Sequence, residues 1–278
     1  MRVRNALKVA FKAAALSVAA VLALRAVAAD LPAEARSAKA GELKVLSAGA
    51  CQRFAAAMAA RFEKQRGQAV SVKEDTVGRL VQRINAGERF DVALLTPGGL
   101  ERVAPRFKAG PPVELARVGI GVAVRENAPR PDIGSVEAFK RSLRQARSVA
   151  YVDPAAGGTS GIYFSRLLER LGIADSVRPK ALLVPGGSVA QRVASGEAEI
   201  GIQMISELTG VKGVALVGPL PAPIQTYTAY AGVAGASASD PAAARALLDL
   251  MAGAQAAGAL KAAGLERPSP VSAPAPAH

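Results

Sequence analysis

Four glycine-rich or hydroxyl-bearing loops contain the residues best suited to binding an anion. They read SAGA at 47–50, DTVG at 75–78, GGTSG at 157–161 and PGGS at 185–188, and each leads into an amphipathic pattern. The first turn of a helix has unpaired N–H groups, and glycine lets a ligand approach the backbone closely. No loop tip carries lysine or arginine, so backbone N–H groups and hydroxyls alone would hold the charge. An ordinary helix cap at Thr159 or Ser160 is the alternative for the third loop.

Histidine and cysteine are nearly absent, which limits the catalytic chemistry. The one histidine is the last residue, His278, and the one cysteine is Cys51. Neither a serine–histidine or cysteine–histidine pair nor a zinc cluster is expected, and no disulfide can form within the chain. Cys51 should be a buried small apolar residue. A Ser160 nucleophile would need Lys108 or Lys180 brought beside it, so we expect a protein that is not an enzyme and has no cofactor or metal.

Strand and helix patterns alternate from residue 42 onward, and each of the four loops joins a strand pattern to the helix pattern that follows it. Short β-rich runs such as ELKVLS and FDVALL are followed by helical patterns such as CQRFAAAMAARFEKQRG. Repeated alternation predicts an α/β fold with mostly parallel sheets and helices on both faces. Ligands in such folds bind outside the carboxyl ends of the strands, where loops lead into helices. The four loops are therefore expected to face one cleft.

Two long β-rich segments indicate where the chain passes between two lobes. We expect the first crossing near residues 124–128 and the return within residues 214–233, which prolines interrupt. The first lobe would then be discontinuous, with residues 42–125 and 225–267, and the second lobe would hold residues 126–224. A closing helix should start at Pro241, with Asp240 as its cap.

The two ends of the chain have compositions unlike the rest. Residues 1–29 combine basic residues, an apolar run from Ala13 to Leu24 and the small residues AVAA, which is the pattern of a cleaved signal peptide; an uncleaved anchor is the alternative. We expect residues 30–41 to be a linker and the Pro/Ala-rich residues 268–278 to be disordered. Loss of the presequence lowers the formal net charge from +13 to +8. The remaining Lys and Arg are scattered and the chain has no Trp, so nucleic acid is not an expected partner.

Six motifs in order resemble the periplasmic binding components of ABC transporters, in particular the molybdate- and tungstate-binding type. The motifs are KVLSAGA, FEKQRGQAVSV, QRINAGERFDVALLT, GGTSGIY, GEAEIGIQM and YAGV, and the resemblance spans about residues 42–265. It implies a type II periplasmic binding fold, in which two lobes, each with a mostly parallel sheet and helices on both faces, close on a tetrahedral oxyanion in the cleft between them.

Residue by residue, the resemblance to the molybdate-binding type is uneven. The family's first hydroxyl falls at Ala50, which lacks it, and its second falls at Thr76. Donors of the second lobe fall at Ser160 and at or near Gly186 and Gly187. The family's cleft tyrosine falls at Met204, which cannot donate a hydrogen bond.

The loops and the resemblance together give one set of ligand-binding candidates. The set is Ser47, Gly49, Ala50, Thr76, Gly78, Thr159, Ser160, Gly186, Gly187 and Met204. Gln203, Thr96, Tyr227 and Tyr230 are alternative donors. We expect a periplasmic, monomeric solute-binding protein that takes a molybdate-like oxyanion or a small carboxylate and delivers it to the membrane permease of an ABC importer. An exported enzyme and a ligand-sensing domain on the same fold are the alternatives.

Overall fold

The computed structural model describes residues 41–106, 110–186 and 188–268. The expected signal peptide lies outside these ranges, as do Gly187 and nearly all of the expected linker and tail. Within the described ranges, no helix combines the length and the apolar character needed to cross a membrane.

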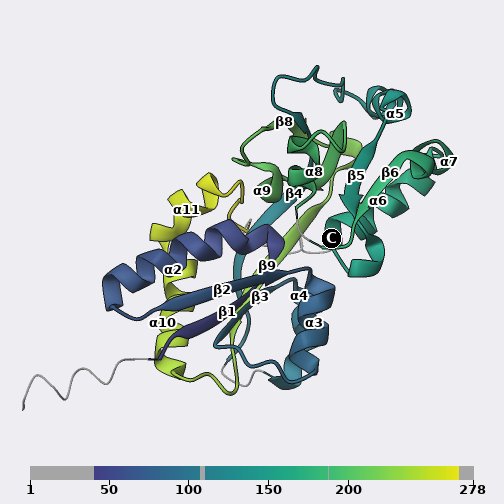
Figure 1. Ribbon diagram of the computed structural model, residues 1–278. Coiled ribbons are helices and arrows are strands. Elements are labelled where there is room, and N and C mark those ends of the chain that lie inside the picture. The colour runs from purple at the N-terminus through teal and green to yellow at the C-terminus, as the bar shows by residue number, and fades with distance from the viewer. Residues whose placement is uncertain (1–40, 107–109, 187, 269–278) are drawn as a thin grey trace, which may run out of the picture. The chain divides into compact units, whose positions relative to one another are not determined.

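Nine strands form one mixed sheet whose order differs from the order of the sequence (Figure 1). Along the sheet the order is β2-β1-β3-β9-β4-β7-β5-β6, and β8 also pairs with β4. Parallel pairs lie toward the two ends, β1 with β2 and β3, and β5 with β6 and β7. In the middle, β9 and β4 pair antiparallel with each other, β9 also with β3, and β4 also with β7 and β8. The strands are β1 Leu43–Ala48, β2 Val70–Asp75, β3 Val92–Leu95, β4 Val113–Arg125, β5 Val149–Val152, β6 Ala181–Val184, β7 Ile200–Met204, β8 Val214–Pro219 and β9 Tyr227–Ala234.

Strand β4 divides the sheet into two parts, which we call sheet A and sheet B. Its residues up to Gly119 pair with β9, which belongs with β1, β2 and β3 to sheet A. Its residues from Ile120 pair with β7 and β8, which belong with β5 and β6 to sheet B. The strand thus changes sheets at residues 119–120, earlier than the segment 124–128 where the sequence led us to expect a crossing. The domain limits themselves stay a prediction.

The helices fill the connections between strands, as the alternating pattern indicated. Asp240 caps α10 by accepting a hydrogen bond from the Ala243 N–H at 2.9 Å, which confirms the expected start of the closing helix. The α-helices are α2 Gln52–Arg66, α3 Val77–Asn85, α4 Pro97–Glu101, α5 Val136–Gln145, α6 Thr159–Arg170, α7 Ala174–Val177, α8 Val189–Ala194, α9 Ile205–Leu208, α10 Pro241–Ala252 and α11 Ala257–Ala262. The short 3-10 helices are η2 Gly49–Cys51, η3 Ala104–Arg106, η4 Pro154–Ala156, η5 Arg178–Lys180, η6 Ala222–Ile224 and η7 Ala254–Ala256.

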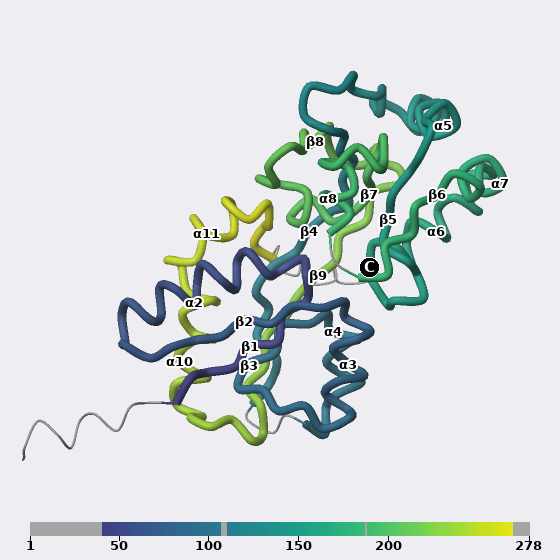
Figure 2. Tube along the Cα trace, viewed as in Figure 1, coloured from purple at the N-terminus to yellow at the C-terminus, as the bar shows by residue number. Residues whose placement is uncertain are grey.

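Helices cover both faces of sheet A. Because successive strand residues point to opposite sides, each strand contributes to two cores. Val45 enters the core that Phe54 of α2 and Leu247 of α10 complete. Its neighbour Leu46 enters a second core, with Leu80 of α3 on the other face. In the chain trace, α2 and α10 lie side by side, and they are in contact (Figure 2).

Sheet B is covered in the same way. Tyr151 of β5 packs edge-on against Phe164 of α6, with ring centroids 5.0 Å apart. The adjacent residues Ala150 and Val152 pack instead with Val189 of α8. The chain is therefore an α/β protein with helices on both faces of its sheets, as the sequence predicted.

Candidate functional site

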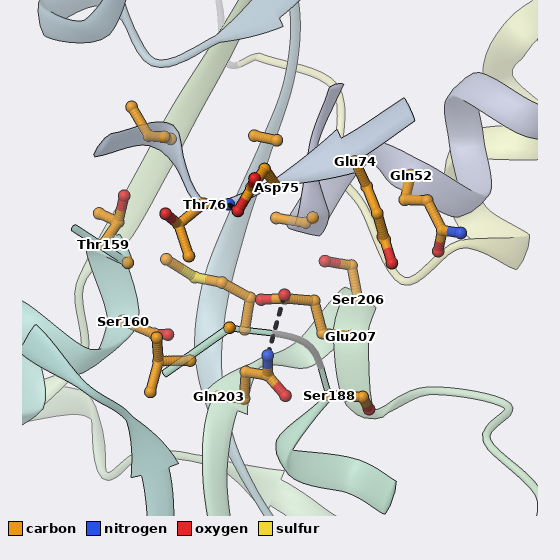
Figure 3. A pocket seen from close by; sticks show the side chains of 18 of the residues that line it. Gln52, Glu74, Asp75, Thr76, Thr159, Ser160, Ser188, Gln203, Ser206 and Glu207 are labelled. Atoms are coloured by element: carbon orange, nitrogen blue, oxygen red, sulfur yellow. Dashed lines mark hydrogen bonds between the residues drawn. The ribbon is translucent and has the colours of Figure 1, made fainter. Parts of the chain in front are cut away.

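A pocket of about 570 Å³ lies where the loops after β1, β2, β5, β6 and β7 meet (Figure 3). It draws residues from both sheets, including the helix starts that the sequence singled out. Its lining is Ala48, Gly49, Ala50, Gln52, Arg53, Glu74, Asp75, Thr76, Val77, Arg79, Val152, Gly158, Thr159, Ser160, Pro185, Gly186, Ser188, Gln191, Gln203, Met204, Ser206, Glu207, Val211 and Tyr230.

Most of the sequence candidates lie in this one pocket. Those that line it are Gly49, Ala50, Thr76, Thr159, Ser160, Gly186 and Met204. Gln203 and Tyr230, named as alternative donors, also line it. Whether these residues bind a ligand stays a prediction.

Four other candidates lie elsewhere in the described structure. Ser47 is fully buried within β1, and its hydroxyl donates to the Ala48 carbonyl at 3.0 Å. Gly78 packs on Gly157, and its N–H donates to the Gly157 carbonyl at 3.2 Å. Thr96 caps α4, and Tyr227 is 52% exposed against Arg117. None of the four lines the pocket.

The Thr76 hydroxyl is already engaged by the protein. It accepts a hydrogen bond from the Arg79 N–H at 3.2 Å, which caps α3, and it donates to the Ala156 carbonyl. Because a hydroxyl has one proton to donate, Thr76 offers no free donor to an anion in this conformation. The hydroxyl instead links the start of α3 to the loop before α6.

Helices α2 and α6 begin at the pocket without a side-chain cap. The cap residue of α6 is Gly158, so Thr159 and Ser160 belong to the first turn, and the alternative of a cap at either residue is wrong. The cap residue of α2 is Cys51, and its side chain makes no capping bond. Both helices are long enough to have an appreciable dipole. The first N–H of α2, at Gln52, already donates to the Gly49 carbonyl, so the first N–H groups of α6 are the natural donors for an anionic group.

Two arginines also reach the pocket, so the expectation of a site without basic side chains is wrong. Arg53 of α2 donates to the carbonyl of Thr209, across the pocket in the loop after α9. Arg79 of α3 lies over Gly186, where an added Cβ would lie 2.8 Å from its Nη1 atom. Both side chains extend from helices of sheet A to loops of sheet B, which places two positive charges at the pocket.

The Glu207 carboxyl is the chemically most unusual group in the pocket. Glu207 is the third residue of α9, and its carboxylate also receives a hydrogen bond from the backbone of Met204, the cap residue of that helix. Burial, with a smaller contribution from the charge of Glu74, raises the pKa of Glu207 to about 8. Near neutral pH this carboxyl can both release and take up a proton.

Glycine at position 49 allows the Glu207 carboxyl to sit this close to the loop after β1. An added Cβ there would lie 2.8 Å from Oε1 of Glu207. The neighbours Cys51 and Tyr230 are buried, and desolvation raises the pKa of both groups, so both are neutral. Cys51 is thus a buried thiol, as the sequence predicted.

Ser206, the residue before Glu207, has an unsatisfied hydroxyl. It is 2% exposed and lines the pocket, and among the described residues its Oγ is the one buried side-chain oxygen or nitrogen without a hydrogen-bond partner. Buried polar atoms are nearly always paired, so this hydroxyl is available to a water molecule or a ligand in the pocket.

Sequence reasoning missed the charged residues of the pocket. Arg53 and Arg79 follow their loops by only three residues or fewer, yet they read as surface residues of amphipathic helices. Glu207 had one usable signal: the run QMISEL places an acidic residue in the first turn after a buried strand. No group of three or more His, Cys, Asp and Glu residues suited to a metal ion occurs in the part of the chain that the structure describes.

Comparisons with known proteins give the chain a family. Residues 43–266 match the family model described as bacterial extracellular solute-binding protein. The model of the chain resembles the periplasmic molybdate-binding protein of Azotobacter vinelandii, with a TM-score of 0.69 and 21% identity over 82% of this chain and 100% of that one. It also resembles the sulfate-binding protein SubI of Mycobacterium tuberculosis, with a TM-score of 0.65 and 15% identity over 83% and 88%. These likenesses show the type II periplasmic binding fold.

A closer relative corrects the expectation that the protein is not an enzyme. An aconitate isomerase from Pseudomonas sp. is 36% identical over 232 residues, which cover 81% of this chain and 87% of the relative. An enzyme of this similarity over most of the chain means that the scarcity of histidine and cysteine does not exclude catalysis on this fold. By its sequence and its fold, the chain belongs to the family of bacterial extracellular solute-binding proteins.

Proposed function

We propose that this protein is an isomerase that moves the double bond of an unsaturated polycarboxylate of the aconitate type, with Glu207 as the acid–base residue. The observation that carries the proposal is the Glu207 carboxyl, which lies in the pocket with a pKa raised to about 8. The relative named aconitate isomerase supports the substrate class.

The reaction requires one mobile proton. Aconitate is propene with a carboxylate on each carbon, so one end of the three-carbon unit is a CH₂ group and the other a double-bonded CH. Ionised Glu207 removes a proton from the CH₂ carbon, and the electron pair spreads over the three carbons onto the carboxylate oxygens. Neutral Glu207 then returns a proton to the other terminal carbon. The double bond has moved, one proton has left and one has been added, and no redox change occurs.

The rest of the pocket suits the anionic substrate and its more strongly charged intermediate. Arg53 and Arg79 offer two positive charges. The uncapped first turn of α6 supplies N–H donors, and the unpaired Ser206 hydroxyl supplies another. Preorganised donors of this kind stabilise charge that develops during the reaction. Below pH 8, Glu207 is mostly neutral and does not repel the entering anion.

The test is direct measurement of isomerisation. Purified protein without residues 1–29 is incubated with cis-aconitate, and the trans isomer is followed by ¹H NMR. We expect the rate to rise with pH toward about 8 in the unsubstituted protein and to fall by at least about 100-fold in Glu207→Gln, the usual range for losing a general base. Glu137→Gln, an exposed change on α5, is the matched control. Absence of isomerisation in the unsubstituted protein, or full activity in Glu207→Gln, would overturn the proposal.

A periplasmic, monomeric binding protein that delivers a small anion to an ABC permease is the second candidate. The solute-binding family and the molybdate- and sulfate-binding neighbours support it. Thermal unfolding with molybdate, sulfate and cis-aconitate separates the two. A ligand at a hundred times its Kd adds about 2.7 kcal/mol to the free energy of unfolding. Stabilisation by an inert oxyanion but not by cis-aconitate would favour the binding protein.

A further inference from the structure

Gln203 connects the Glu207 carboxyl to the start of helix α8. The residue lies in β7, is 1% exposed and uses both ends of its side-chain amide. Its Oε1 accepts a hydrogen bond from the backbone N–H of Val189 at 3.1 Å. Its Nε2 donates to Oε1 of Glu207 at 2.9 Å, the dashed line in Figure 3.

The Val189 N–H fixes which way the Gln203 amide faces. A backbone N–H only donates, so it requires the amide oxygen of Gln203, and the NH₂ group must then face Glu207. Since an NH₂ group also only donates, Oε1 of Glu207 must accept and cannot carry the proton in that direction. A carbonyl oxygen accepts better than a protonated one, so when Glu207 is neutral the Gln203 donor favours the proton on the other oxygen, Oε2.

We propose that Gln203 is a positioning residue for proton transfer, which holds Oε1 of Glu207 so that the mobile proton is carried by Oε2. This inference rests on the acid–base role proposed for Glu207. Gln203 need not touch the substrate to have this role. The start of α8, Gln203 and Glu207 form one hydrogen-bonded unit.

The groups that face Glu207 from other elements predict opposite effects for two substitutions. Gln203 and the Met204 backbone favour the ionised form of Glu207, whereas the negative charge of Glu74 on β2 favours the neutral form. Cys51 of η2 and Tyr230 of β9 are the remaining titratable neighbours, and both are neutral. Removing the Gln203 donor should raise the pKa of Glu207, and removing the Glu74 charge should lower it.

The experiment titrates Glu207 by ¹³C NMR in protein labelled at the glutamate carboxyl carbons, with Glu207→Gln to assign the signal. Gln203→Met should raise the pKa of Glu207 by about one pH unit, the effect of losing one hydrogen bond to a charged group. Glu74→Gln should lower it. Gln145→Met, at the exposed end of α5, should leave it unchanged. If Gln203→Met does not fold, Gln203→Glu keeps an acceptor for Val189 and should also raise the pKa.

Rates measured on the same variants separate positioning from a structural role. In Gln203→Met, isomerisation of cis-aconitate at pH 7 should fall about tenfold and recover at more alkaline pH, because one pH unit in pKa is a factor of ten in the ionised fraction. An unchanged Glu207 titration, or a loss of rate that alkaline pH does not restore, would overturn the role of Gln203. If the unsubstituted protein does not isomerise cis-aconitate while the NMR shift is present, the proposed function fails and the hydrogen-bonded unit stands.

Discussion

A carboxyl group that keeps its proton in the folded chain makes stability depend on pH. Folding raises the pKa of Glu207 from 4.5 to about 8, so between these values the folded state binds more protons than the unfolded state. The stabilising contribution of neutral Glu207 is fully present below pH 4.5 and is lost as the pH rises to about 8. Glu88, which Lys44 and Arg83 contact, has its pKa lowered to about 2, and its contribution is lost in the opposite direction, as pH falls below 4.5.

We expect Glu207→Gln to remove this alkaline loss. The free energy of unfolding of the unsubstituted protein, relative to that of Glu207→Gln, should decrease by up to about 1.4 kcal/mol per pH unit between about pH 5 and 8, and level off above. Urea unfolding at a series of pH values measures it. Parallel curves for the two proteins over this range would mean that Glu207 is ionised throughout.

At the scale of single residues, the sequence predicted the loop residues of the pocket better than its charged side chains. Residues such as Gly49 and Thr159 could be placed at the pocket because the strand, loop and helix pattern around each of them is local. Glu207 could not, because its pKa is raised first by burial and then by the charge of Glu74 on β2, and both depend on how segments distant in the sequence pack together. The engagement of Thr76 with Ala156 was hidden for the same reason.

The helices that begin at the pocket contribute side chains as well as N–H groups. Helix α2 carries one arginine in its first turn and one in its last turn, which allows the two arginines to be compared. Arg53 lies in its first turn and lines the pocket, whereas Arg66 lies in its last turn and stacks on Phe62 at 5.6 Å. If Arg53 contacts a substrate carboxylate, Arg53→Met should weaken substrate binding by about 1.5–3 kcal/mol, and Arg66→Met should not. The KM for cis-aconitate, with calorimetric titration of a non-reacting tricarboxylate, measures both. Equal values for the two variants would remove Arg53 from the binding site.

Single helices and strands could be predicted from local sequence patterns, whereas the pairing of the strands could not. The pattern at residues 51–67 predicted the helix seen as α2, because apolar spacing and Gly67, its left-handed C-terminal residue, both act locally. The change of sheet within β4 had no such signal. Its residues on either side of Ile120 are equally apolar, and only their partners β9, β7 and β8 distinguish them.

At the scale of the whole molecule, parts of the chain from sheet A and sheet B touch beside the pocket at two glycines. A Cβ on Gly78, the second residue of α3, would lie 2.7 Å from the Cα of Gly157. A Cβ on Gly98, the second residue of α4, would have no atom within 4 Å. Gly78→Ala should therefore hold the two sides of the pocket apart, whereas Gly98→Ala should not.

We expect Gly78→Ala to weaken ligand binding and to increase the radius of gyration in the presence of ligand, while its fold is kept because alanine suits a helix. Small-angle scattering with saturating cis-aconitate, together with the KM, provides the comparison. If Gly78→Ala and Gly98→Ala behave alike, the contact at Gly157 has no part in forming the site.

The place of β9 in the sheet also determines the order in which the protein can be completed. This strand is the last of the nine in sequence, yet it lies between β3 and β4 and pairs with both. While the chain is being synthesised, those two strands have no partner on these edges until residues 227–234 arrive. Unpaired apolar edges are sites of aggregation, and pairing between distant segments is slow. A chain truncated before β9 would therefore fail to close its sheet and would expose two unpaired strand edges, so the protein's yield depends on completing the chain through residue 234.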